Sequence, residues 1–113
     1  MTSRRHPDLD SLRVNESTDY NTGRGNIYAD MDLSDRLPHE PHGIRAQAQQ
    51  VNGRDWMVRV THGPHEERDN TGSYYRSVAS DIISGVTPSK VKTHVQRAVR
   101  EAHKDLLRGR RGE

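Results

Sequence analysis

The segment from Gly85 to Val95 is the part of this chain that most restricts how it can fold. Gly85 suits the left-handed position that ends a helix, Thr87 can cap a following helix with its hydroxyl group, and Pro88 suits a first helical position. The turn between the two helices would be about three residues long, as in the helix pairs of DNA-binding proteins. The segment therefore predicts a helix-turn-helix.

The second of these helices is the clearest element in the sequence. From Thr87 to about Arg108, apolar residues recur every three or four positions, and Gly109 is expected to end the helix. The apolar stripe consists of Val91, Val95, Ala98, Val99, Ala102 and Leu106, and polar and basic residues occupy the opposite face. The pattern predicts a long amphipathic helix with one packed face and one basic face.

The element that precedes the turn, Tyr74 to Ile83, is less certain in type. Its apolar residues fall within one helical arc, which favours a helix, although its Tyr, Val and Ile residues also form strands readily. A helix here gives an α+β domain in which a β-hairpin precedes a helix-turn-helix-like pair with a long basic C-terminal helix. A strand gives the alternative order β-β-β-α.

The hairpin is expected from Gly43 to about His62, because apolar and polar residues alternate on either side of Asn52-Gly53. A two-residue Asn52-Gly53 loop would split the apolar face. A three-residue loop, Val51 to Gly53, would set Ala48 opposite Trp56, Ala46 opposite Val58 and Ile44 opposite Val60. We predict the second register because it buries one face.

Composition divides the chain into three segments. Only 29% of the residues are hydrophobic and there is no Phe or Cys, so a large core or a disulfide framework is excluded. Residues 1–41 are polar and acidic with isolated apolar residues, and we expect an arm that is disordered by itself, in which Ile27 to Leu33 docks on a partner or on the domain. Residues 42–108 are the small α+β domain, and residues 109–113 are a basic tail.

The basic face of the last helix suggests nucleic acid as the partner. Basic residues outnumber acidic residues by eight to three in 90–113, which suits phosphate oxygens, although a charge run is more often a solvated face. Helical phase assigns one set of residues to a DNA groove and another to phosphates. The groove set is Ser89, Lys90, Thr93, His94, Gln96 and Arg97, and the phosphate set is Lys92, Arg100 and Lys104, extended by Arg108, Arg110 and Arg111.

Three local resemblances bear on this interpretation. Residues 85–95, a Gly, an apolar residue, a Thr and then Val-Lys-x-His-Val, resemble the recognition segment of LuxR-type response-regulator domains, which implies DNA-contacting roles for Lys90, Lys92 and Thr93. If Tyr74 to Ile83 is a strand, Ser89-Lys90-Val91-Lys92 is similar to the helix start of double-stranded-RNA-binding domains. The strand-then-helix order then also looks like a HicB-type antitoxin.

Metal binding and catalysis have less support. His39 with His42, and His62 with His65, have a metal-ligand spacing, but both pairs lie in loops with Pro or Gly, so solvated histidines are the expectation. The chain has no nucleophile elbow and no phosphate-binding glycine loop. We predict no enzyme, no metal and no cofactor.

The sequence thus predicts a cytoplasmic DNA-binding regulatory or accessory protein, with RNA as the alternative ligand and no membrane partner. A homodimer is expected because the core is thin. The rival hypothesis is a protein-interaction factor, such as a phage inhibitor or virion component, whose N-terminal arm binds a protein.

Overall fold

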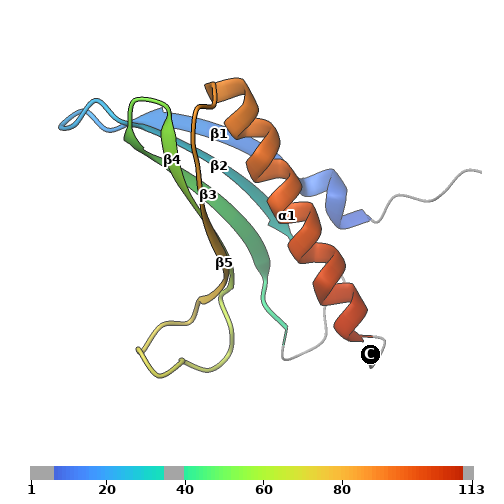
Figure 1. Ribbon diagram of the computed structural model, residues 1–113. Coiled ribbons are helices and arrows are strands. Elements are labelled where there is room, and N and C mark those ends of the chain that lie inside the picture. Colours follow the sequence, from blue (N-terminus) through green and yellow to red (C-terminus); the bar gives the residue numbers. More distant parts are fainter. Residues whose placement is uncertain (1–6, 35–39, 111–113) are drawn as a thin grey trace, which may run out of the picture.

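A computed structural model describes residues 7–34 and 40–110. In these residues five strands form one antiparallel sheet, in the order in which they follow one another along the chain, and a long helix lies across one face (Figure 1). The elements are η1 (Pro7–Ser11), β1 (Arg13–Thr18), β2 (Gly25–Asp32), β3 (Gly43–Asn52), β4 (Asp55–Gly63), β5 (Arg76–Ile83) and α1 (Pro88–Arg110).

The predicted helix-turn-helix is wrong, because the strand β5 stands where its first helix was expected. β5 pairs with β4 from Trp56↔Ile83 to His62↔Arg76. This pairing gives partners to the backbone groups along one edge of β4, which a helix would have left unpaired. The β-β-β-α alternative fits, with β1 and β2 added in front of it.

The start of α1 follows the expected capping pattern. Gly85 has φ +68°, the Thr87 hydroxyl group accepts a hydrogen bond from the Lys90 amide at 3.4 Å, and the helix begins at Pro88. Gly109 does not end α1, which extends to Arg110. These capping residues therefore specify one helix that follows a strand.

The β3–β4 hairpin has the predicted faces but a different register. Ala48 lies opposite Val58 and Ala46 opposite Val60, two residues away from the predicted partners, and Asn52 pairs with Asp55 around a Gly53-Arg54 turn. A bulge at Val51 takes up the extra residue. Because the shift is two residues, the same side chains still face the core.

Part of the segment that was set apart as an arm belongs to the sheet. Residues 13–32 supply β1 and β2, and β2 pairs with β3 from Asn26↔Gln49 to Asp32↔Gly43. Ile27, Met31 and Leu33 are buried in the core. Of the two docking sites predicted for Ile27 to Leu33, the structure shows the one on the domain itself, and a boundary at residue 41 does not divide the fold.

The core lies between α1 and the sheet. α1 packs mainly against β2 and β3 and much less against β4. The buried side chains come from alternate positions of these strands and from the apolar stripe of the helix: Ile27, Ala29, Met31, Leu33, Ile44, Ala46, Ala48, Trp56, Val58, Val60, Val91, Val95, Val99 and Ala102. Three alanines in the sheet let the helix approach closely. The opposite face of the sheet carries mostly polar residues, and β5 lies beyond the helix.

Candidate functional site

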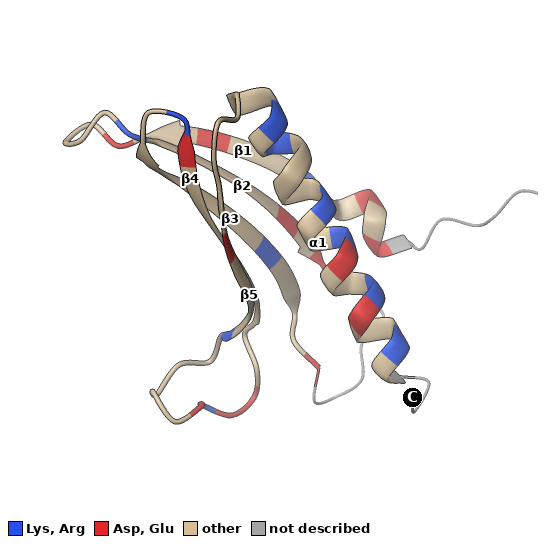
Figure 2. Ribbon diagram, in the orientation of Figure 1, with Lys and Arg blue, Asp and Glu red and all other residues tan. Residues whose placement is uncertain are grey.

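The outward face of α1 carries most of the residues predicted to contact nucleic acid. We call this surface, Lys90, Arg97, Arg100, Lys104 and Arg108, the basic face; all five side chains are exposed, and basic residues follow one another along the helix in Figure 2. Ser89 and Thr93 are also exposed, whereas Lys92, His94 and Gln96 lie half-buried at its borders. Arg110 ends α1, and Arg111 lies outside the described residues.

Ion pairs divide the cations of α1 into two groups. Lys104 Nζ lies 3.6 Å from Glu101 Oε1, and Arg108 Nη1 lies 3.1 Å from Asp105 Oδ1, both within the helix. By contrast, Lys90, Arg97 and Arg100 form no ion pair with any other described residue. Among the cations of α1 whose side chains the structure describes, these three are therefore the ones available to a ligand without breaking an ion pair.

Lys92 has a structural partner that helical phase could not reveal. Its Nζ lies 3.2 Å from Glu16 Oε2 on β1, so the side chain ties the start of α1 to an edge strand. The Thr93 hydroxyl group donates to the Ser89 carbonyl oxygen at 3.2 Å, within the helix. Of the residues implied by the LuxR-type resemblance, only Lys90 has a side chain without a hydrogen-bond or ion-pair partner in the described part of the chain.

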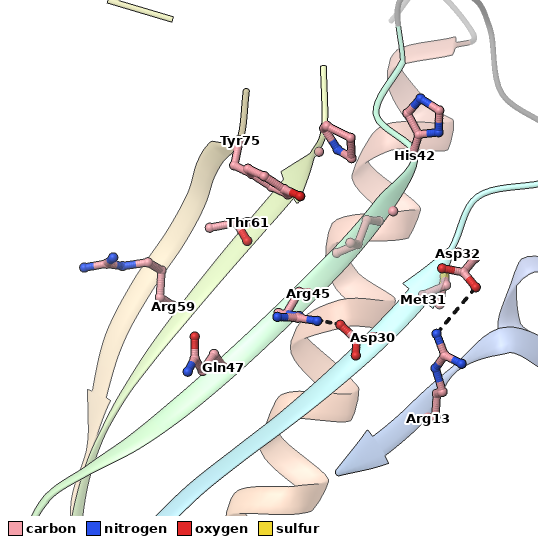
Figure 3. Close-up of a pocket in the computed structure, with 14 residues that line it drawn as sticks. Arg13, Asp30, Met31, Asp32, His42, Arg45, Gln47, Arg59, Thr61 and Tyr75 are labelled. Atoms are coloured by element: carbon pink, nitrogen blue, oxygen red, sulfur yellow. Dashed lines mark hydrogen bonds and ion pairs between the residues drawn. The ribbon is translucent and has the colours of Figure 1, made fainter. Parts of the chain in front are cut away.

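The sheet face opposite α1 holds a polar hollow of about 500 Å³ (Figure 3). Arg45 Nε donates to Asp30 Oδ1 at 2.5 Å, and its guanidinium group lies 5.0 Å from the centre of the Tyr28 ring. Arg13 Nη2 lies 3.7 Å from Asp32 Oδ2. The hydrogen bond from Arg45 to Asp30 raises the pKa of Arg45. Since two of its cations already face carboxylates, the hollow is a weaker anion site than the basic face.

Sequence reasoning missed this hollow because its residues come from β1, β2, β3, β4 and the loop before β5. Arg45 and Asp30 are directly opposite each other in the β2–β3 ladder. The sequence feature that could have revealed the hollow is the alternation of polar and apolar residues in 26–32 and 43–49. Once those two strands are paired, this alternation places Asp30 and Arg45 on one face.

A buried polar cluster joins the two ends of the described chain. Asp8 is 1% exposed and His103 3% exposed, and Asp8 Oδ2 lies 3.2 Å from His103 Nε2. Asp8 Oδ1 accepts hydrogen bonds from the Ser34 amide at 3.0 Å and the Ser34 hydroxyl group at 2.7 Å. The carboxylate of Asp8 therefore joins buried His103 of α1 to exposed Ser34, so the cluster fixes η1 and the residues just after β2 against α1.

His62, near the end of β4, forms a pair with His65 in the β4–β5 loop. His62 Nδ1 and His65 Nε2 are 2.6 Å apart, so one ring donates and the other accepts when both are neutral. Burial lowers the pKa of both rings. The positive charge of Arg76 lowers both pKa values further, and the charge of His62 also lowers the pKa of His65. Glu66 and Glu67 lie beside His65. Within the described residues, no three His, Cys, Asp or Glu side chains form a metal-binding group.

This pair predicts a loss of stability at acidic pH. Because the folded pKa lies below the ordinary 6.5, the unfolded chain takes up these protons first, and stability falls as the pH drops below about 7 toward the folded pKa. The urea midpoint, followed by Trp56 fluorescence, should fall between about pH 7.5 and pH 5. The fall should be smaller in His62→Gln, whereas exposed His42→Gln should retain it; equal falls in all three proteins would contradict the prediction.

No protein-family model, curated protein or solved structure matches this chain. In the described residues, no helix combines the length and apolar character needed to cross a membrane. Among the described residues, charged and polar side chains gather in the basic face, the polar hollow and the buried cluster.

Proposed function

We propose that this protein binds duplex nucleic acid, DNA in the first instance, through the basic face of α1. The observation that carries the proposal is that Lys90, Arg97 and Arg100 are exposed on one side of one helix without an acidic partner among the described residues. Cations in this state can neutralise phosphates without first breaking an ion pair.

Phosphate contacts are the main source of affinity in this proposal. A long helix backed by a sheet offers a rigid row of cations, and Arg97 and Arg100 lie nearly one turn apart along it. Ser89 remains a candidate for a base contact, while the cations of the basic face, Lys90, Arg97, Arg100, Lys104 and Arg108, serve phosphates. The protein would act by occupying its site, as a regulatory or accessory factor, without catalysis.

The rival hypothesis of a wrapping arm has less structural support. Residues 7–34 lie in η1, β1 and β2 and in the turns around them, and Glu16 of this segment is paired with Lys92. This part of the chain is therefore engaged with its own domain.

The test is a titration of a fluorescein-labelled DNA duplex of about 20 base pairs, read by anisotropy at several salt concentrations. We expect the logarithm of the binding constant to fall linearly with the logarithm of salt concentration, with a slope of about −3 or steeper for three or more phosphate contacts. The same titration with an RNA duplex of equal length tests the alternative ligand, which would bind more tightly than the DNA duplex. Absence of salt-dependent binding to either duplex would refute the proposal.

A further inference from the structure

The polar hollow on the sheet face opposite α1 is divided into two unlike halves. Its two carboxylates, Asp30 and Asp32, both belong to β2, and each of them faces an arginine. Figure 3 shows these two carboxylates on one side of Arg45 and a group of side chains from β3, β4 and the loop before β5 on the other side. We call this second group, Gln47, Arg59, Thr61 and Tyr75, the donor half of the hollow; all four side chains can donate hydrogen bonds, and none is acidic.

Strand pairing holds the donor half together. Gln47 lies directly opposite Arg59 in the β3–β4 ladder, and opposite side chains of this kind begin about 5 Å apart. In the described part of the chain, the side chains of Gln47, Arg59 and Thr61 form no hydrogen bond or ion pair. Gln47 and Thr61 are half-buried, so a ligand that displaces the remaining water must offer acceptors to them.

Tyr75 is an aromatic wall of the hollow that the backbone holds in place. The carbonyl oxygen of the preceding residue, Tyr74, accepts a hydrogen bond from the His65 amide at 2.7 Å. Gly63 makes room for the ring, because a Cβ atom at this position would lie 2.7 Å from Tyr75 Cδ1. Tyr75 is 55% exposed, and among the described residues no cation or second ring lies over it. Its ring is therefore available for stacking.

The order of these groups along β4 fits a ligand of three parts. Tyr75 lies against Gly63, and Thr61 is two residues away along the strand. Arg59 is four residues from Gly63, or about 13 Å at roughly 3.3 Å per residue. A planar ring on Tyr75 and an anionic group at Arg59 would therefore be joined by a polar spacer beside the Thr61 hydroxyl group. The base, sugar and phosphate of a nucleotide follow one another in this order, and a hollow of about 500 Å³ has the size of a small-molecule site.

We propose that the polar hollow binds a nucleoside monophosphate group, with the base on Tyr75, the sugar at Thr61 and the phosphate at Arg59 and Gln47. Arg59 is exposed and forms no ion pair with a described residue, so its guanidinium group can turn to the phosphate without losing a partner. A guanidinium group binds phosphate oxygens in pairs. The ligand is either a free nucleotide or the 5′-phosphorylated end of an unpaired strand, because both present the same chemistry. The site does not depend on the proposed function of α1.

The test is a titration of the full chain with adenosine 5′-monophosphate at low salt, followed by two-dimensional NMR of the backbone amides. We expect saturable binding with a Kd below about 1 mM, and the largest shifts at the donor half. Adenosine and inorganic phosphate each lack one part of the ligand and should bind at least about ten-fold more weakly. Absence of saturable binding, or shifts confined to α1, would overturn the proposal.

Replacement of Arg59 by glutamine should weaken binding of adenosine 5′-monophosphate about ten-fold or more and leave binding of adenosine unchanged, because only the phosphate loses its partner. Arg54→Gln makes the same charge change at an exposed turn residue outside the hollow and should bind like the wild type. Equal losses in the two variants would mean that net charge alone decides the affinity, which would overturn the proposal.

Replacement of Tyr75 by leucine removes the stacking surface. It should weaken binding of both adenosine 5′-monophosphate and adenosine about five-fold or more, whereas Tyr20→Leu at a fully exposed turn residue should have no effect. An unchanged affinity in Tyr75→Leu would overturn the proposed orientation of the base. If Tyr75→Leu does not fold, the comparison of Arg59→Gln with Arg54→Gln decides.

A 5′-phosphorylated single strand of about eight nucleotides separates the two sources of the ligand. Tighter binding of the strand than of the mononucleotide, lost in Arg59→Gln, supports the site and identifies a strand end; weaker binding supports the site and identifies a free nucleotide. Joint replacement of Lys90, Arg97 and Arg100 by alanine should leave binding of the mononucleotide unchanged. Failure of duplex binding would therefore refute only the proposed function, and loss of mononucleotide binding in this variant would overturn the inference.

Discussion

Replacement of Lys90, Arg97 and Arg100 together by alanine is expected to weaken duplex binding by roughly 100-fold at about 0.1 M salt. Each phosphate contact contributes about 0.9 to the slope of the logarithm of the binding constant against the logarithm of salt concentration, so loss of three contacts should make the slope shallower by about 2.7. The measurement is the anisotropy titration on the same labelled duplex. The variant should fold normally, because all three side chains are exposed and alanine favours a helix.

The matched control removes the same charge from other surfaces. Arg24, Arg54 and Arg59 are exposed and none of them lies on α1, and their combined replacement by alanine changes the net charge equally. This control should lose much less affinity and keep most of the salt slope. Equal losses in the two triple variants would mean that binding follows net charge alone, and the basic face would then have no special role.

Replacement of Asp8 by alanine is expected to lower the free energy of unfolding by about 3 kcal/mol. The substitution removes the carboxylate that contacts His103 Nε2 in a buried site and that accepts from the Ser34 amide and hydroxyl group. Asp8→Asn keeps an amide oxygen for Ser34 and should lose less. Urea unfolding at fixed protein concentration, followed through the buried Trp56, measures both.

The control for this prediction lies on the same short helix. Asp10 is exposed on η1, and Asp10→Ala should change the free energy of unfolding by no more than about 0.5 kcal/mol. If Asp8→Ala unfolds at the same urea concentration as Asp10→Ala, the cluster does not hold η1 and α1 together. His103→Ala offers a second variant from the α1 side, and its loss should overlap that of Asp8→Ala in the double variant.

The last helix and the faces of the central hairpin could be predicted because their signals are local. The Thr87 cap, the Pro88 start and the apolar stripe from Val91 to Leu106 specify a helix without reference to the rest of the chain. Strict alternation around Trp56 placed the correct side chains in the core. The exact register depended on the Val51 bulge, which has no strong local signal, and so the predicted partners were two residues off.

The elements at the two edges of the sheet could not be predicted from their own residues. Residues 13–32 look too polar to bury, but β2 needs only Ile27, Ala29 and Met31 on one face because α1 covers that face. Val78 and Ile82 suggested a buried helical stripe, and they lie exposed on β5 instead. In both cases the deciding interaction is a backbone ladder with a strand distant in sequence.

The sequence by itself determined that the chain has a basic amphipathic helix, which side of that helix packs, and that a hairpin lies before it. Among the cations of α1, Lys104 and Arg108 have local acidic partners, Glu101 and Asp105, three residues away on the same helix. Only the tertiary structure decided that Lys92 pairs with Glu16 of β1. It also decided that, in residues 7–34 and 40–110, α1 is the one α-helix and packs on a five-stranded sheet. The physical reason is that helix phase, capping and ion pairs three residues apart act locally, whereas strand pairing and the Lys92–Glu16 ion pair join residues that only the fold brings together.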